Sequence, residues 1–513
     1  MTEISTTRSS LTRASTIADL VRRSARRVPG DTALVFGDRT WTYAEVDSAA
    51  TALARHFLGL GLGKGDRVAA YGTNSDLYVL VFLGVVRAGL THVPVNYQLK
   101  NDELEYLLTD SGATVVVSDR ALLPDVEATA AGQTVQRMLF DDLLPVATAA
   151  EVAPAGSEEF DVADTDLAQL LYTSGTTSAP KGAMMTHRAL VHQYISCLDE
   201  LDFEASDRQV HALPLYHSAQ MHVFMLPALA RGAYNIIVPG PVPADLMELI
   251  ETERIDTFFA APTVWVALVN HPDFATRDLS SLRKAYYGAS IMPGPVLTRL
   301  QERLPELGFY NCFGQSEMGP LCTVLRPEEH ADHPGSAGRP TLFVETRVVD
   351  ADDQDVAPGE QGEILYRSPH LCEGYWNKPE ATEEAFRGGW FHSGDLVKQD
   401  ENGFIEVVDR VKDVINTGGV LVASRQVEDA IFELAEVAEV AVVGQPDEKW
   451  IEAITAYVVR KDDVLDAADL TVDSVLAHVK DRLAPFKVPK AVHFVDALPK
   501  NSAGKILKRS LRD

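Results

Sequence analysis

The apolar and polar positions of the first 320 residues alternate between a helical and an extended pattern. Apolar residues recur with the three- and four-residue spacing of a helix face in three stretches, 17–27, 43–60 and 77–88. Shorter apolar runs lie among them and predict strands at 67–71, 91–95 and 114–118. Strands that alternate with helices form a mainly parallel sheet with helices on its faces. After a Pro-, Ala- and acid-rich surface connection at 145–164, the alternation resumes from 166 to about 320.

The pattern changes beyond residue 340. Short extended runs between turn residues predict a β-rich subdomain with strands at 344–349, 362–366 and 403–408. A charged break, Asp409-Arg-Val-Lys-Asp413, separates it from a short α+β unit. That unit has predicted helices at 424–434 and 472–482 and strands at 439–443, 454–459 and 491–495. We therefore predict a large N-terminal domain, 1–409, a hinge at 410–413 and a small C-terminal domain, 414–513.

Composition narrows the class of protein. The chain has 513 residues, of which 46% are hydrophobic and 23% charged, as in globular proteins with more than one core. No apolar run approaches the ~20 residues of a membrane span, and the N-terminus lacks the apolar block of a secretory signal. The four cysteines show no Cys-x-x-Cys spacing, so we expect reduced thiols and a cytoplasmic protein. The net charge of −28 argues against nucleic acid and anionic membranes as partners.

One segment carries the clearest chemical signal, Tyr172-Thr-Ser-Gly-Thr-Thr-Ser-Ala-Pro-Lys-Gly182. It follows a predicted strand at 167–171 and precedes a predicted helix for which Thr186 is a suitable N-cap. A strand, a loop rich in hydroxyls and glycine, and a helix together supply the donors that hold phosphate. A Walker A loop ends in Gly-Lys-Ser/Thr, whereas Lys181 here follows a proline and precedes a glycine.

This segment resembles the phosphate loop of the adenylate-forming enzymes, which include acyl-CoA synthetases, peptide-synthetase adenylation domains and luciferases. Further segments that resemble motifs of the family follow in order as far as residue 505. The resemblance implies an α/β fold. Its large N-terminal domain has mainly parallel sheets flanked by helices and a β-rich subdomain, and its small C-terminal α+β domain is mobile. It also implies ATP, Mg²⁺ and coenzyme A as the small molecules used.

The resemblance assigns the nucleotide-binding residues. In the phosphate loop these are Thr173, Ser174, Gly175, Thr176, Thr177 and Lys181, and Ser178 stands where the family commonly has glycine. Gly288, Ala289 and Ser290 are expected along the adenine, which Phe313 and Gly314 also face. Ser316 replaces the usual threonine near the α-phosphate, and Glu317 is expected to bind Mg²⁺, since a hard carboxylate near phosphates suits that ion. Asp395 is expected on the ribose hydroxyls, and Arg410 on the ribose or phosphate.

The C-terminal part resembles the mobile domain of the family. By resemblance, Lys505 in Pro499-Lys-Asn-Ser-Ala-Gly-Lys505 neutralises the carboxylate and the α-phosphate during adenylation. Lys412 matches the hinge, and Gly418 and Gly419 match the loop along which pantetheine passes. The chain departs from the family pattern in two places. Val420 and Leu421 replace a usual Glu-Asn pair, and Ile451 stands where glycine is common.

A third group is expected at the acyl pocket. Leu213-Pro-Leu-Tyr-His217 resembles the acyl-pocket motif, in which His217 lies near the substrate carboxylate or gates the pocket; a structural, hydrogen-bonded histidine is the alternative. No aspartate stands where amino-acid-activating domains anchor the α-amino group, and small residues leave room for a bulky acid. The pocket residues predicted in this way are Tyr216, His217, His222, Tyr287, Cys312 and Gly319.

The resemblance implies an ATP-dependent carboxylate–CoA ligase that works through an acyl-AMP, with a medium- or long-chain or other bulky apolar acid preferred. Three alternatives stay open. One is an acyl-AMP ligase that loads a carrier protein, and another is a ligase specialised for one half-reaction, for which a partner ligase supplies or uses the intermediate. The third, of a different class, is an inactive nucleotide-binding scaffold. The joint presence of Glu317, Asp395, Arg410 and Lys505 argues against the third.

Overall fold

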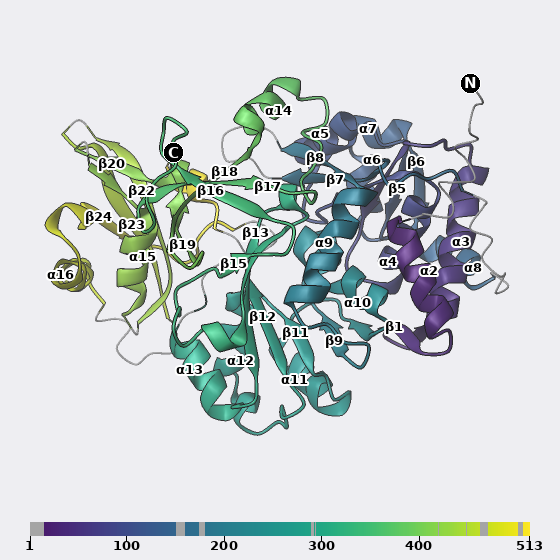
Figure 1. Cartoon of the computed structure of the whole chain (residues 1–513), viewed down its shortest axis with the longest axis horizontal. Coiled ribbons are helices and arrows are strands. Elements are labelled where there is room, and N and C mark those ends of the chain that lie inside the picture. Colours follow the sequence, from purple (N-terminus) through teal and green to yellow (C-terminus); the bar gives the residue numbers. More distant parts are fainter. Residues whose placement is uncertain are drawn as a thin grey trace. The chain divides into compact units, whose positions relative to one another are not determined.

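The computed structural model describes the residues 15–149, 160–173, 180–288, 292, 294–418, 420–434, 436–447, 449–461, 470–500 and 506–512. Figure 1 shows their helices and strands. The chain forms two compact units, which are described separately. Unit 1 comprises Met1–Glu345 and Arg367–Gly389, and unit 2 comprises Thr346–Tyr366 and Trp390–Asp513.

Within the described residues, unit 1 contains a six-stranded sheet in the order β6-β5-β3-β4-β7-β8. Its strands are β3 (Arg67–Tyr71), β4 (Thr91–Val95), β5 (Val115–Ser118), β6 (Gln136–Leu139), β7 (Leu167–Thr173) and β8 (Lys181–Thr186). Neighbouring strands are parallel except for β7 and β8, which pair antiparallel. The strands are short and mostly buried because helices cover the parallel part of such a sheet.

The helices around this sheet follow from their sequences. Every residue of α4 (Asp76–Arg87) is buried, as its nearly continuous apolar run predicts. α2 (Ile17–Arg27) and α3 (Tyr43–Gly59) each begin with a capping box, at Thr16 and Thr42. The other helices linked to this sheet are α5 (Asn101–Ser111), α6 (Leu123–Glu127), α7 (Ala130–Thr134), α8 (Phe140–Thr148) and α9 (His187–Glu200).

A second sheet of unit 1 has, among the described residues, nine strands in the order β15-β14-β13-β12-β11-β9-β10-β1-β2. The strands from β13 to β1 in this order are parallel. The pairings at the ends are antiparallel, with β2 at one end and β14 and β15 at the other. Their bounds are β1 (Thr32–Phe36), β2 (Arg39–Thr42), β9 (Arg208–His211), β10 (Tyr234–Ile237), β11 (Thr257–Phe259), β12 (Lys284–Gly288), β13 (Gly308–Gly314), β14 (Leu321–Leu325) and β15 (Arg339–Pro340).

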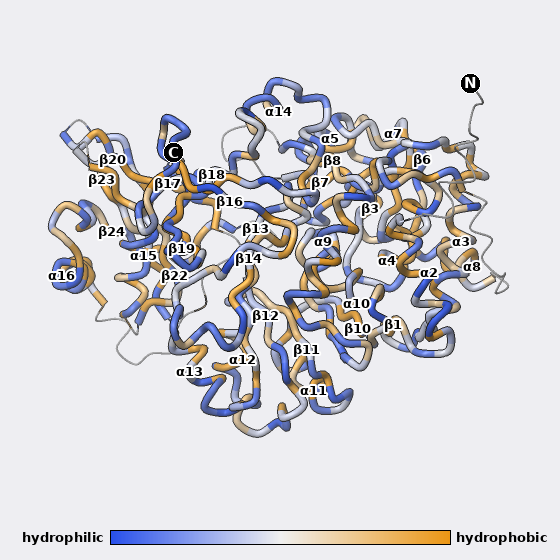
Figure 2. Tube along the Cα trace, in the orientation of Figure 1, coloured by the Kyte–Doolittle hydropathy of each residue, from blue (hydrophilic) through white to orange (hydrophobic). Residues whose placement is uncertain are grey.

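Helices also accompany this second sheet. Figure 1 shows α11, α12 and α13 in teal beside β9, β11 and β12. Their bounds, with those of the remaining helices of unit 1, are the π-helix η1 (Ala219–Met225), α10 (Leu226–Arg231), α11 (Pro243–Thr252), α12 (Pro262–Asn270), α13 (Gly294–Arg303) and α14 (Pro379–Ala385). Figure 2 shows apolar colour along many of the strands and polar colour on the outward loops, as buried strands require.

Unit 2 contains two smaller sheets in its described residues. One joins β16 (Glu345–Val349), β17 (Gln361–Arg367), β18 (Phe391–Gln399) and β19 (Ile405–Arg410). The other joins β20 (Ile415–Thr417), β21 (Val420–Val422), β22 (Val437–Asp447), β23 (Ile451–Arg460) and β24 (Ala491–Phe494). Two helices pack with the second sheet, α15 (Ser424–Phe432) and α16 (Val472–Arg482).

The predicted α/β fold class is confirmed, and most predicted elements lie within two residues of the observed ones. Two strands are longer than predicted, since β22 ends at Asp447 and β23 begins at Ile451, and the start of the surface connection is also wrong. The surface connection predicted to start at Pro145 starts later, because α8 continues through Pro145 to Thr148. Leu143 and Ala147, on either side of the proline, are buried in the core, and this burial offsets the one N–H that proline removes.

In the part of the chain that the structure describes, no helix is long and apolar enough to cross a bilayer.

Candidate active site

The phosphate loop lies at the tip of a hairpin. Thr173 and Lys181 are register partners at the ends of β7 and β8, so they close the base of the loop between them. Ser174, Gly175, Thr176, Thr177 and Ser178 lie outside the described residues. The predicted order of strand, loop and helix needs one correction. The strand β8 stands between the loop and α9, since Gly182, Ala183 and Met185 are buried against β7.

The helix after the loop begins where predicted. The hydroxyl of Thr186 accepts a hydrogen bond from the backbone N–H of Ala189 (3.1 Å), which makes Thr186 the N-cap of α9. Because β8 separates this helix from the loop, the N-terminus of α9 does not directly follow the phosphate loop.

Glu317 is the centre of a group of side chains in unit 1. It lies in a short 3₁₀-helix, η3 (Ser316–Met318), and is 9% exposed. Its Oε1 atom accepts hydrogen bonds from the Thr173 hydroxyl (3.3 Å) and the Tyr375 phenol (3.1 Å). The structure therefore brings the predicted residues Thr173 and Glu317 together and adds Tyr375, which the sequence analysis did not single out.

Lys181 contacts the face of the Tyr375 ring and so lies beside the side chains around Glu317. Its Nζ atom lies 5.0 Å from the ring centroid, within the range of a cation–π interaction. Burial raises the pKa of Tyr375 above its ordinary range, and the Glu317 carboxylate adds to the shift. The phenol thus stays protonated at neutral pH and donates to the carboxylate.

The residues at Glu317 fit a magnesium ion. No described residue is hydrogen-bonded to Oε2 of Glu317, so one carboxylate oxygen is open to a ligand. Among the described residues no three His, Cys, Asp or Glu side chains cluster as an all-protein metal site would need. Mg²⁺ in nucleotide sites is bound by one or two carboxylates with phosphates and waters, so a single carboxylate suffices.

Ser316 is connected to the acyl-pocket motif. Its hydroxyl oxygen lies 3.0 Å from that of Ser218, which immediately precedes the π-helix η1. His217, the residue before Ser218, accepts a hydrogen bond at Nδ1 from the backbone N–H of Ala219 (3.3 Å). π-Helical turns are rare and occur often at functional sites. Ser218 therefore links the end of the acyl-pocket motif to Ser316.

His222 lies deeper, on η1, and is fully buried. Its Nδ1 lies 2.7 Å from the Tyr194 hydroxyl and its Nε2 lies 2.6 Å from Oε1 of Gln169. Gln169 in turn bonds Nδ1 of His92 (2.9 Å). Burial lowers the pKa of His222 to about 3, so the ring is neutral at physiological pH. These contacts fix its position within the core of unit 1.

The strands β12 and β13 bring the predicted adenine and acyl residues side by side. Gly288 and Cys312 are register partners, and a Cβ atom at Gly288 would lie 2.2 Å from the Cys312 carbonyl oxygen. A Cβ atom at Gly314 would lie 1.8 Å from the carbonyl oxygen of Pro320. Both positions therefore require glycine because backbone passes against them. Phe313 is half-buried between Cys312 and Gly314 on β13.

The other predicted pocket residues lie on unit 1 as well. The Tyr287 hydroxyl, on β12, lies 3.0 Å from Nε2 of His330. The ring of Tyr216 packs edge-on against Tyr97, at 5.5 Å between centroids. Gly319 ends η3 with a φ of +90°. Ala289 and Ser290 lie outside the described residues.

In unit 2, Asp395 and Arg410 form an ion pair. They are register partners on β18 and β19, with 2.7 Å between Oδ1 of Asp395 and Nε of Arg410. The carboxylate is buried, and the guanidinium also donates to the backbone carbonyl of Ser393 (3.4 Å). The two residues predicted for the ribose are thus brought together within one unit.

The remaining predicted residues belong to unit 2. Lys412 lies in the single-turn helix η6 (Val411–Asp413). Gly418, with a φ of +63°, donates its N–H to the carbonyl of Trp450 (2.5 Å) in the turn between β20 and β21. Gly419 and Lys505 lie outside the described residues.

Two residues at the site, Tyr375 and Ser218, were missed from the sequence. Ser218 directly follows the acyl-pocket motif that ends at His217, and this adjacency was the available signal. Tyr375 follows Gly374 in a segment with no periodic pattern, so only its aromatic neighbour Trp376 marked the place.

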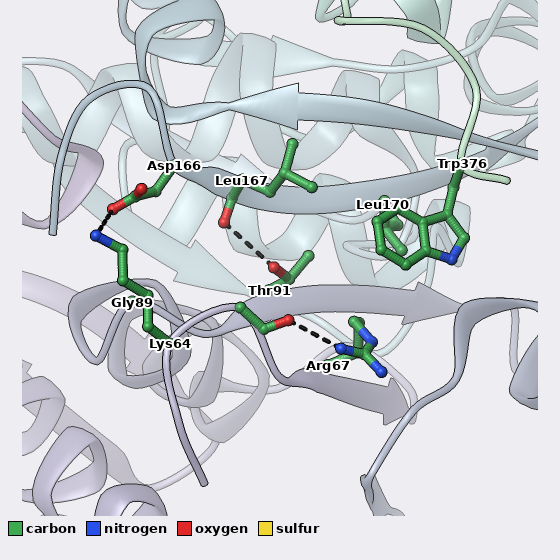
Figure 3. A pocket seen from close by; sticks show the side chains of 9 residues that line it. Lys64, Arg67, Gly89, Thr91, Asp166, Leu167, Leu170 and Trp376 are labelled. Carbon is green, nitrogen blue, oxygen red and sulfur yellow. Dashed lines mark hydrogen bonds and ion pairs between the residues drawn. The ribbon is translucent and has the colours of Figure 1, made fainter. Parts of the chain in front are cut away.

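Unit 1 also has a pocket of about 190 Å³ away from Glu317, shown in Figure 3. Trp376 and Leu170 form one wall, and Arg67 lies below the indole. The charged groups that line it already have partners. Lys64 pairs with Asp166 at 2.7 Å, and Arg67 donates to the carbonyls of Gly65 and Gly112. We assign no ligand to this pocket.

The chain is similar to known AMP-binding enzymes over most of its length. A family model described as AMP-binding enzyme matches residues 21–376, and one described as AMP-binding enzyme C-terminal domain matches residues 426–505. A feruloyl-CoA synthase of Amycolatopsis sp. is 37% identical over 492 residues, 96% of this chain and 97% of the relative. A long-chain-fatty-acid–CoA ligase of Escherichia coli O157:H7 is 34% identical over 542 residues, 98% of this chain and 95% of the relative.

The solved structures agree. The anthranilate CoA ligase AuaEII in complex with anthranoyl-AMP superposes with a TM-score of 0.88 at 26% identity, over 97% of this chain and 96% of that one. The predicted resemblance to acyl-CoA synthetases is confirmed, as are the acid–thiol ligase class and the use of ATP, Mg²⁺ and coenzyme A in this family. The chain belongs to the AMP-binding enzyme family.

Proposed function

We propose that this enzyme joins a bulky apolar carboxylic acid to coenzyme A in two steps. In the first, a carboxylate oxygen attacks the α-phosphorus of ATP, the bond to the bridging oxygen breaks, and pyrophosphate leaves. In the second, the thiol of coenzyme A loses its proton and attacks the acyl carbonyl, and AMP leaves. The observation that carries the proposal is the group in which Glu317 accepts hydrogen bonds from Thr173 and Tyr375 beside Lys181.

The residues of unit 1 supply position and charge rather than a nucleophile. We propose that Lys181 and Thr173, which pair at the ends of β7 and β8, hold the phosphates and balance charge on the leaving pyrophosphate. Glu317 would hold Mg²⁺, which when bound neutralises phosphate charge and withdraws electrons from the phosphorus. Ser316, held by Ser218, is placed toward the α-phosphate in this proposal.

The residues of unit 2 complete the assignment. We propose that Asp395 accepts hydrogen bonds from the ribose hydroxyls, for which its pairing with Arg410 keeps it oriented. Lys505 is proposed to neutralise the attacking carboxylate in the first step. Lys412 is proposed as part of a hinge at 410–413, and the segments matched by the two family models lie on either side of it.

The acid is proposed to be a medium- or long-chain or other bulky apolar acid. Cys312, half-buried on β13, adds little side-chain volume next to the strand that carries Tyr287. The relatives named above act, by their names, on ferulic acid and on long-chain fatty acids, which are bulky and largely apolar. His217 is proposed to lie at the carboxylate end of the pocket, because Ser218 joins it to Ser316.

Coenzyme A is proposed as the acceptor, and a carrier protein that bears the same pantetheine thiol is the alternative. We also propose that the protein works in the cytoplasm. All four cysteines lie in described segments and none is in a disulfide, which supports a reducing compartment.

The test is pyrophosphate release and product mass across a panel of fatty, aryl and polycyclic acids, with and without coenzyme A. A parallel tube receives preformed acyl-AMP and coenzyme A. Pyrophosphate and acyl-CoA from one class of acid support the full ligase and name the substrate class. If no pyrophosphate is released from ATP but the supplied acyl-AMP is converted to acyl-CoA, the full ligase is contradicted. That result favours a ligase restricted to the second step. If product forms only with a phosphopantetheinylated carrier protein, the acceptor is that carrier protein and not coenzyme A.

A further inference from the structure

The segment Cys372–Trp376 adds an extended chain to the edge of the phosphate-loop sheet. Tyr375 forms an antiparallel bridge with Ala183 on β8. The backbone N–H of Met184 donates to the carbonyl of Gly374 (2.9 Å), and the N–H of Trp376 donates to the carbonyl of Gly182 (2.8 Å). β8 is the last named strand of its sheet, so this segment covers an edge that would otherwise be open.

Consecutive residues of an extended chain point to opposite sides, and the two aromatic residues of the segment do so. The Trp376 indole N–H donates to the carbonyl of Asp110 (3.1 Å), and the ring forms a wall of the pocket in Figure 3. The Tyr375 hydroxyl, on the other side, donates to Oε1 of Glu317. Trp376 thus anchors the segment while Tyr375 contacts the proposed metal-binding carboxylate.

The segment also holds the backbone of Glu317. The N–H of Cys372 donates to the carbonyl oxygen of Glu317 (2.8 Å). Tyr375 is itself fixed, because its N–H donates to the hydroxyl of Thr382 (2.9 Å) at the start of α14. Glu317 is therefore held at both its backbone and its side chain by one short segment that belongs to none of the named strands or helices.

We propose that Tyr375 is a positioning residue for the metal-binding carboxylate of Glu317, an inference that rests on the function proposed above. With Oε1 accepting from Thr173 and Tyr375, Oε2 would be left to bind the ion. The Tyr375 ring between Lys181 and Glu317 keeps the ammonium from pairing directly with the carboxylate. A hydrogen-bond donor behind a metal ligand orients that ligand.

A purely packing role would need only the ring. Tyr375 lies in the core that includes Ala183 and Cys372, where phenylalanine fills the same space. The hydroxyl is what distinguishes the two roles, so Tyr375→Phe is the informative change. Tyr310→Phe is the matched control, since it removes a phenol that donates to the Asp202 carboxylate (2.7 Å) elsewhere in unit 1.

The measurement is the affinity for Mn²⁺ in the presence of α,β-methylene-ATP, a nucleotide that cannot release pyrophosphate, followed through the electron paramagnetic resonance signal of free Mn²⁺. We expect Tyr375→Phe to weaken Mn²⁺ binding about 10-fold, as loss of a group behind a metal ligand does. Tyr310→Phe should stay within about 2-fold of the unchanged protein. The affinity for the nucleotide without metal should not change in either variant.

Combining Tyr375→Phe with Glu317→Gln tests whether the phenol acts through the carboxylate. We expect Tyr375→Phe to add no further loss of Mn²⁺ affinity once Glu317 is replaced, because interacting residues are not additive. An equal loss in both backgrounds, or unchanged Mn²⁺ affinity in Tyr375→Phe, overturns the positioning role. If the positioning role fails but the unchanged protein releases pyrophosphate, the proposed ligase function still stands. If the unchanged protein neither binds Mn²⁺ with the nucleotide nor releases pyrophosphate, both proposals fail.

Discussion

At the scale of single residues, Ile451 has the least favourable backbone conformation for its side chain. It has a φ of +68° and is 58% exposed at the start of β23. A β-branched residue in the left-handed region is strained by roughly 1–2 kcal/mol. Glycine adopts this conformation freely and is what the family commonly has here, although it loses more chain entropy on folding.

We expect Ile451→Gly to raise the free energy of unfolding of unit 2 by about 1 kcal/mol, the strain relieved less the entropy lost. Urea unfolding followed by Trp450 fluorescence would measure it. Ile451→Val is the control, since valine keeps the branched Cβ and the strain. Equal stability of the glycine variant and the unchanged protein would show that the strain is absent.

Lys505 carries the sharpest prediction about the chemistry. We expect Lys505→Ala to abolish acyl-AMP formation, because the carboxylate then meets the α-phosphate without a neutralising charge. Thioester formation from supplied acyl-AMP should remain largely intact. Lys500→Ala is a suitable control, since Lys500 pairs with Glu439 at 2.6 Å. Equal loss of both half-reactions in Lys505→Ala would refute the role assigned to it.

At the scale of elements, the hairpin of β20 and β21 presents apolar side chains to solvent. Val420 is 44% and Leu421 67% exposed, where the family pattern has Glu-Asn. We expect Val420→Glu with Leu421→Asn to change the rate of thioester formation from acyl-AMP and leave pyrophosphate release as it was. Stability should change by no more than about 0.5 kcal/mol, as for other surface changes.

Val472→Glu supplies the comparison for that hairpin. Val472 is 38% exposed in the first turn of α16, where a glutamate suits the helix end. Like Val420→Glu, Val472→Glu replaces an exposed valine of unit 2 by an acid. A rate change seen only in the hairpin variant is therefore an effect of the hairpin and not of added charge. An altered pyrophosphate step in the hairpin variant would contradict the assignment to the thioester step.

Elements also show how far sequence reasoning reaches. Helices such as α16 and strands such as β3 and β4 were predicted to the residue, because local periodicity and capping decide them. β8 was missed as a strand because its only named partner, β7, lies across the phosphate loop. The sheet order was beyond prediction, since β1 pairs with β10 about 200 residues away. The contact of Tyr375 with Glu317 spans 58 residues and has no local signal.

At the scale of the whole molecule, unit 1 buries histidines in neutral form. Burial lowers the pKa of His92 and His222 to about 3, and of His187, His211 and His370 to about 4. In the unfolded chain these rings titrate near pH 6.5, so between pH 6.5 and 4 the unfolded state binds more protons. Stability is thus retained above pH 6.5 and lost as the pH falls toward 4.

We expect the urea concentration at the unfolding midpoint of unit 1 to decrease when the pH is lowered from 7.5 to 5.5. Each of these histidines should contribute about 1 kcal/mol to the loss of unfolding free energy. His211→Gln removes one of them and keeps a group that can bond Asn235 and Gln220, the present partners of its ring. The variant should therefore lose less stability over this pH range, by about 1 kcal/mol. The same pH dependence in both proteins would contradict a neutral buried ring at this position.

The hairpin that closes the phosphate loop has a consequence for engineering. Thr173 and Lys181 are register partners, so the strand ends on both sides of the loop are held by each other. A loop grafted from another adenylating enzyme would start and finish on the same two anchors. We expect such a graft to change the rate of pyrophosphate release, the step assigned to the phosphate loop, and to leave the acid that the enzyme accepts unchanged.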